Sequence, residues 1–167
     1  IFCATQFTLQ SQTGYPLAHW DFNGISGAST VKAIYTGGGI SSVAPSTYVS
    51  FGSGVAVCNW YTGNGFTGRQ TAITLNDAIN DHVYLSFTIT PLSSTGINIT
   101  DISYTAFSQN QNRSFALFSS INGFNAANAI QINENVASGT RLNYSLTNHI
   151  NITSPVEFRV YVYGVYD

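Results

Sequence analysis

Charged side chains are scarce in this sequence: five Lys and Arg and seven Asp and Glu stand among 167 residues. They make up 7% of the chain, whereas about 25% is usual in a soluble domain. The net charge is −2, and the basic residues are scattered singly, so no positive surface is available for a nucleic acid or an anionic membrane. The sequence therefore predicts no nucleic-acid partner.

Long apolar runs are also missing, since no window approaches the roughly 18 consecutive apolar residues of a membrane-spanning helix. No membrane insertion is expected. Neutral hydrogen-bonding side chains replace the missing charge, with 16 Asn, 19 Ser and 18 Thr. Together with aromatic and β-branched residues, they suit a pleated and half-buried strand. The composition predicts an all-β protein of the extracellular or cell-surface type.

Only two cysteines are present, Cys3 and Cys58, and they lack the C-x-x-C spacing of metal or redox motifs. A disulfide between them is one interpretation, and two buried free thiols are the alternative. The disulfide would close a loop of about 55 residues, which the chain-entropy model values at about 4 kcal/mol. It would also indicate an oxidising compartment. Pairing within one subunit and pairing between two subunits are both open.

Alternation of apolar and polar residues recurs along the chain and predicts β-strands. It is clearest in residues 83–90 and 156–163, and in the second of these Glu157 and Arg159 share one face. In residues 97–107 the apolar residues change from odd-numbered to even-numbered positions near Asp101. This change of parity predicts one long strand with a bulge. Further strands are expected at 17–22, 31–35, 47–51, 55–60, 113–119, 128–133 and 140–146.

About ten short strands with turn-forming residues between them, and no helices, predict an antiparallel β-sandwich of the jelly-roll type. The length fits one domain with one core. Residues 1–16 are expected to form an N-terminal strand and joint, and residues 17–167 a single sandwich domain. The glycine-rich stretches 37–39 and 63–68 are expected to be loops.

Five segments resemble, in order, a recurrent secreted bacterial domain. They are 17–24 (Leu-Ala-His-Trp-Asp-Phe-Asn-Gly), 83–91, 97–107, 113–124 and 158–164 (Phe-Arg-Val-Tyr-Val-Tyr-Gly). The family is that of the jelly-roll modules of surface and sorting-signal-bearing proteins, with WDF, FTITP, R…S…GF and FRVYGY segments. The resemblance covers most of residues 17–164, and it implies a jelly-roll fold and export from the cell. The resemblance implies no shared catalytic residues.

The first ten residues, which precede the resemblance, have an amphipathic pattern of their own. The alternation places one set of residues on one face: Ile1, Cys3, Thr5, Phe7 and Leu9. A strand of this kind either belongs to its own sheet as an ordinary first strand or is donated to a neighbouring copy. Head-to-tail donation does not close on itself and grows a fibre.

The first functional hypothesis follows from this strand. It is a non-enzymatic, secreted structural or adhesive surface protein that forms filaments with copies of itself. Deletion of residues 1–12 is expected to abolish polymerisation and to leave a folded domain.

The alternative function is a carbohydrate-binding module. Trp60, Tyr61 and Phe66 lie in a loop-like stretch rich in Asn, Thr and Gly, which are the residue types of an aromatic platform for a polysaccharide. Aromatic residues of β proteins also serve as core or cross-strand partners, and that interpretation stays open.

Residues that support catalysis or metal binding are few. No G-x-S-x-G motif occurs, and no histidine lies near Cys58 in sequence, so no enzyme activity and no cofactor are expected. Asp77 and Asp81 are the only close pair of carboxylates; a calcium loop is one interpretation, and a plain turn is the favoured one. His19 lies between apolar residues and is expected to be a hydrogen-bonded structural histidine.

Four N-x-[S/T] sequons are candidate glycosylation sites: Asn98, Asn112, Asn143 and Asn151. The abundance of Asn, Ser and Thr produces about this many by chance, so the sequons are not independent evidence of glycosylation.

Overall fold

The computed structural model describes residues 2–11, 16–22, 28, 30–33, 35–37, 39–41, 48–57, 66–92, 96–108 and 111–164. These residues contain thirteen strands, one α-helix and one 3-10 helix. The first strands are β1 (Phe2–Ser11), β2 (Pro16–Asp21), β3 (Thr30–Lys32), β4 (Tyr35–Thr36), β5 (Tyr48–Phe51), β6 (Ala56–Val57) and β7 (Phe66–Arg69). After the helix α1 (Leu75–Asn80) come β8 (Tyr84–Ile89), β9 (Ile99–Ser108), β10 (Arg113–Ser119), the 3-10 helix η1 (Ala126–Asn128), β11 (Gln131–Val136), β12 (Thr140–Ser145) and β13 (Val156–Tyr163).

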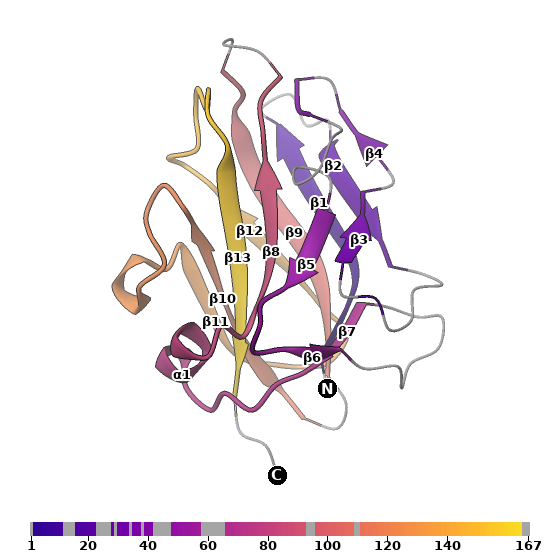
Figure 1. Ribbon diagram of the computed structural model, residues 1–167, viewed down its shortest axis with the longest axis vertical. Coiled ribbons are helices and arrows are strands. Elements are labelled where there is room, and N and C mark those ends of the chain that lie inside the picture. The colour runs from indigo at the N-terminus through magenta and orange to yellow at the C-terminus, as the bar shows by residue number, and fades with distance from the viewer. Residues whose placement is uncertain are drawn as a thin grey trace.

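The strands form two antiparallel sheets that lie one in front of the other (Figure 1). The seven-stranded sheet has the order β12-β9-β1-β2-β4, and in addition β7 pairs with β1 and β6 pairs with β7. The six-stranded sheet has the order β11-β10-β13-β8-β5-β3. Strands that follow one another in the chain lie in different sheets, except for the pairs β1 and β2, β6 and β7, and β10 and β11. The chain therefore passes repeatedly from one sheet to the other, as in jelly-roll sandwiches. The predicted antiparallel β-sandwich is confirmed.

The two clearest predicted strands lie side by side in the middle of the six-stranded sheet. In β8 the buried residues Leu85, Phe87 and Ile89 alternate with half-buried polar or aromatic residues. In β13 the same alternation buries Phe158 and Val160 against the other sheet. The period of two therefore assigned the inward face of both strands correctly.

The predicted change of parity in the third strand is a β-bulge in β9. Along β1, successive residues pair with Asp101 and then with Ile99, so Thr100 is skipped in the register. This extra residue allows Ile99 and Ile102, which are three positions apart, to be buried together. The predicted bulge is confirmed.

A row of aromatic rings crosses the core from one sheet to the other. Trp20 of β2 is fully buried, and its ring centroid lies 5.3 Å from that of Phe87 in β8. Phe87 stacks on Phe158 of β13 at 5.3 Å, and Phe158 lies 5.3 Å from the ring of His149. Apolar burial between the two layers is the main source of stability in such a sandwich.

Two elements differ from the sequence-based expectations. The stretch 63–68 was expected to be a loop, but Phe66–Arg69 forms β7, because it finds a pairing partner on each side in β1 and β6. A turn was expected at Asp77 and Asp81, but Asp77 lies in the helix α1 and Asp81 is its C-cap. A capping box between Thr74 and Asp77 begins this helix.

The predicted strand 31–35 is two short strands that belong to different sheets. Thr30–Lys32 pairs with β5 in the six-stranded sheet, and Tyr35–Thr36 pairs with β2 in the seven-stranded sheet. A continuous apolar pattern does not reveal that the chain changes layers in the middle of it.

Candidate functional site

The predicted N-terminal strand lies in the middle of the seven-stranded sheet. One edge of β1 pairs with β9 from Phe2 to Ser11. The other edge is shared, since Phe2 to Ala4 pair with β7 and Gln6 to Gln10 pair with β2. Without β1, β9 and β12 have no connection to the rest of this sheet. In this structure β1 therefore has the position of an ordinary strand of its own sheet, which is one of the two alternatives expected from the sequence.

The alternation expected for residues 1–9 does not run through the whole of β1. Its register with β9 shifts between Ala4, which stands opposite the buried Ala106, and Phe7, which stands opposite the buried Tyr104. Ala4 and Phe7 differ in parity and yet both pair with buried residues. The strand therefore contains a bulge between Ala4 and Phe7. Before the bulge even-numbered residues stand opposite the buried residues of β9, and after it odd-numbered residues do. The single face predicted from Ile1 to Leu9 is corrected accordingly.

The outward side of this sheet is polar. Thr8 Oγ1 lies 2.8 Å from Nδ1 of His19, its pairing partner in β2, so His19 is the hydrogen-bonded histidine that was expected. On the other side of β1, Arg141 donates from Nη2 to Ser103 Oγ at 3.0 Å. These contacts hold neighbouring strands in register on the solvent side.

The two cysteines and the aromatic platform fall mostly outside the described residues. Cys58, Trp60 and Tyr61 are not among them, and for Cys3 and Phe66 only the backbone positions in β1 and β7 are described. The disulfide and the carbohydrate platform stay predictions.

The carboxylate pair at Asp77 and Asp81 has a structural role at the two ends of α1. Asp77 Oδ2 accepts hydrogen bonds from Thr74 N and Oγ1, both at 2.8 Å. These bonds lower the pKa of Asp77. Asp81 is the C-cap residue of the same helix. In the part of the chain that the structure describes, no group of three or more His, Cys, Asp and Glu residues is placed to hold a metal ion.

The sequons differ in exposure. Asn112, Asn143 and Asn151 are exposed. Asn98 is half-buried, and its Oδ1 accepts a hydrogen bond from the backbone N–H of Asn151 at 2.7 Å. The first three are therefore the more accessible candidates for a glycan.

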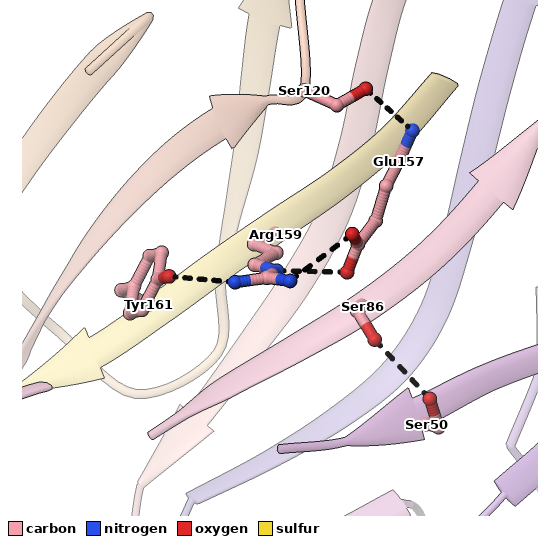
Figure 2. A network of polar contacts seen from close by, with 6 residues as sticks. All are labelled: Ser50, Ser86, Ser120, Glu157, Arg159 and Tyr161. Atoms are coloured by element: carbon pink, nitrogen blue, oxygen red, sulfur yellow. Dashed lines mark hydrogen bonds and ion pairs between the residues drawn. The ribbon is translucent and has the colours of Figure 1, made fainter. Parts of the chain in front are cut away.

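A cluster around Glu157 and Arg159 lies on the outward face of the six-stranded sheet (Figure 2). The guanidinium donates from Nε to Glu157 Oε1 at 2.8 Å and from Nη2 to Oε2 at 3.1 Å. It also contacts the Tyr161 hydroxyl at 3.4 Å from Nη1. Partial burial alone lowers the pKa of Arg159, but these contacts outweigh it and raise the pKa further above its ordinary value.

Two aromatic rings lie against the same guanidinium. Its central carbon lies 4.5 Å from the ring centroid of Tyr84 and 3.9 Å from that of Phe124. The Tyr161 ring meets Tyr84 and Phe118 edge to face, at 5.2 and 5.1 Å. Arg159 is thus fixed by ion pairing and by cation–π contacts.

One feature of the sequence pointed to this cluster, namely two opposite charges on one face of a strand in a chain with few charges. No feature pointed to Phe124, because that residue comes from the loop after β10.

A second polar pair, Ser119 and His149, is buried in the core. His149 Nε2 and Ser119 Oγ are 2.9 Å apart, and both residues are almost fully buried. A serine beside a histidine is the arrangement of a nucleophile and its base, but a substrate has no access to a pair this deeply buried. Burial lowers the pKa of His149, which favours the neutral imidazole in the folded protein at neutral pH.

Acid is expected to destabilise the protein through His149. The unfolded chain takes up a proton on this residue near pH 6.5, whereas the folded chain takes it up only at lower pH, so stability falls as the pH drops below about 6.5. Urea unfolding at a series of pH values measures this, and His149→Gln should flatten the acid limb. The exposed His82, replaced as His82→Asn, is the matched control and should keep the slope of the parent protein. Equal slopes in all three proteins would contradict the assignment.

Comparison with known proteins gives no relative: no family model, no curated protein and no solved structure matches the chain. Among the described residues, no helix has the length and apolar character needed to cross a membrane.

Proposed function

We propose that the protein is a non-enzymatic, extracellular structural or adhesive subunit that associates with copies of itself by exchanging β1. The observation that supports this most directly is the position of β1, which pairs along both edges in the middle of a sheet. A central strand contributes main-chain hydrogen bonds on both sides, so the sheet depends on having a strand in this place. The same contacts form whether the strand comes from the same chain or from a neighbouring one.

The chain connectivity supports exchange as well. Residues 12–15 connect β1 to β2, so this connection has to open for β1 to leave its own sheet. A strand passed from each copy to the next gives a head-to-tail assembly that does not close. The low content of charged residues suits a subunit outside the cell, because few Lys and Arg residues are available to trypsin-like proteases.

Locking β1 in its own sheet tests this proposal. Thr8 and Ser103 are direct partners across β1 and β9, so Thr8→Cys with Ser103→Cys places two thiols within disulfide range. The matched control is Asn143→Cys with Ser103→Cys, which ties β12 to β9 and leaves β1 unconstrained. Peptide mapping identifies the engineered bond in each variant.

The expected oligomeric state of the β1 variant depends on whether the disulfide is formed before or after refolding at high concentration. When the β1 variant is oxidised as a dilute monomer and then refolded at high concentration, it should remain monomeric by light scattering. When it is oxidised after refolding, it should form a covalent ladder of oligomers. The control variant should form non-covalent oligomers in both orders. The proposal fails if no oligomer forms at any concentration, or if the locked variant assembles as the control does.

A further inference from the structure

The outward face of the six-stranded sheet carries a row of polar groups around the cluster described above. Arg159 of β13 pairs with Ser86 of β8, Ser86 pairs with Ser50 of β5, and Ser50 pairs with Thr30 of β3. The Ser50 and Ser86 hydroxyls are 3.2 Å apart (Figure 2). Thr88 stands beside Glu157 in the next row. Hydroxyl groups therefore continue from the ion pair across three strands.

The polar groups of the cluster are partly open to solvent. The side chain of Arg159 is 21% exposed and that of Glu157 is 31% exposed. A guanidinium has five N–H donors. Two of them bond to Glu157 and one to Tyr161, which leaves two of the five. Each carboxylate oxygen of Glu157 has accepted one hydrogen bond from Arg159 and has a second lone pair available. Donors and acceptors are thus presented side by side.

The cluster is also held rigidly before any ligand binds. The guanidinium contacts the rings of Tyr84 and Phe124, and Glu157 fixes its orientation through two hydrogen bonds. A ligand that bonds to these groups does not have to order two long side chains, so less conformational entropy is lost on binding.

The charges of the cluster indicate the class of ligand. Glu157 balances the charge of Arg159, so neither an anion nor a cation finds an uncompensated partner there. A neutral ligand with neighbouring hydroxyl groups suits the site, because each hydroxyl is able to donate to the carboxylate and to accept from the guanidinium. The row of serine and threonine hydroxyls offers further partners of the same kind.

We infer that the outward face of the six-stranded sheet, centred on Glu157 and Arg159, binds a neutral glycan. The site lies on the opposite sheet from β1, so binding there does not depend on strand exchange. It is also distinct from the platform predicted at residues 60–66, because none of its groups comes from that segment.

Binding measurements on the chain of 167 residues test the inference. The probes are neutral homopolymers of glucose, mannose, galactose and xylose, and polygalacturonate serves as an acidic polymer. Glu157→Gln removes the charge of the acceptor, and Arg159→Lys keeps the positive charge but loses the forked donor geometry. Arg141→Lys, on the exposed side of the seven-stranded sheet, is the matched control. Affinity electrophoresis and calorimetry measure binding, and thermal melting measures folding.

Binding to at least one neutral polymer is expected, weakened about tenfold or more by Glu157→Gln and Arg159→Lys and unchanged by Arg141→Lys. No binding to any neutral polymer would overturn the inference. So would unchanged binding in both cluster variants, or binding to polygalacturonate alone.

A measurement on the parent protein keeps the test valid if a cluster variant fails to fold. An oligosaccharide cut from the bound polymer is titrated into the isotopically labelled chain and followed by NMR. The Arg159 Nε–H signal and the amides of residues 86–88 and 157–161 should shift. Shifts confined to residues 101–105 and 141–145, on the other sheet, would contradict the site. Oligomer formation is measured in a separate experiment. The proposal of strand exchange and the inference of glycan binding are therefore tested independently, and either one can fail alone.

Discussion

A chain that lacks residues 2–11 is expected to lose the cooperative unfolding transition of the chain that contains them. These residues are β1, the strand that joins β9 and β12 to the remainder of the seven-stranded sheet. Without it, strand edges in the middle of the sheet have no partner, and buried residues next to β1, such as Trp20 and Tyr104, lose a neighbouring strand. Thermal melting followed by near-ultraviolet circular dichroism measures the loss.

The position of β1 changes the expectation drawn from the sequence, in which a folded domain remained after this deletion. A synthetic peptide of residues 1–12 added to the truncated chain should restore the melting transition, because the strand position is then filled from a second molecule. A peptide of the same composition in scrambled order is the control and should restore nothing. A truncated chain that melts cooperatively by itself would show that β1 is dispensable to the sandwich.

Trp20→Ala should destabilise the protein by about 3–5 kcal/mol, which is the usual effect of removing a large aromatic side chain from a core. Trp20 is fully buried in β2 and contacts Phe87 of the opposite sheet, so its loss leaves a cavity between the layers. Part of the aromatic row that joins the two sheets is removed with it. The midpoint and slope of urea unfolding give the change in the free energy of unfolding.

The control for this prediction is an apolar residue on the surface. Ile73 is 60% exposed, so Ile73→Ala should change the free energy of unfolding by about 0.5 kcal/mol or less. Trp20→Phe should lie between the two, since it retains an aromatic ring in the layer. A loss for Trp20→Ala no larger than that for Ile73→Ala would show that the aromatic row does not carry the stability assigned to it.

The strands that the sequence predicted best are those with one face in the core. Burial alternates in β8 and in the first half of β13, and the alternation marked both strands and their inward faces. From Val160 to Tyr163 every residue of β13 is buried, which the alternation did not predict for Tyr161 and Tyr163. In β9 the change of parity revealed the bulge at Thr100 as well. These signals are reliable because the burial of alternate side chains follows directly from the extended backbone.

Other elements depend on partners that the sequence does not identify. β7 is a strand because β1 and β6 flank it, although its residues include glycine and follow a loop-like stretch. The helix α1 is only six residues long, so its capping box was the only local signal for it. In the candidate glycan site, the sequence predicted that Glu157 and Arg159 share a face but not that Phe124 lies on the guanidinium.

Composition and the period of two were enough to predict an antiparallel β protein with little charge, and to indicate the inward faces of β8 and β13. Each segment carries these two signals in its own residues, whatever it pairs with. The packing of the folded chain places β1 in the middle of a sheet, divides residues 30–36 between two sheets and brings His149 to Ser119. These contacts join segments far apart in the chain, and the choice among many similar strand edges depends on how the whole core packs.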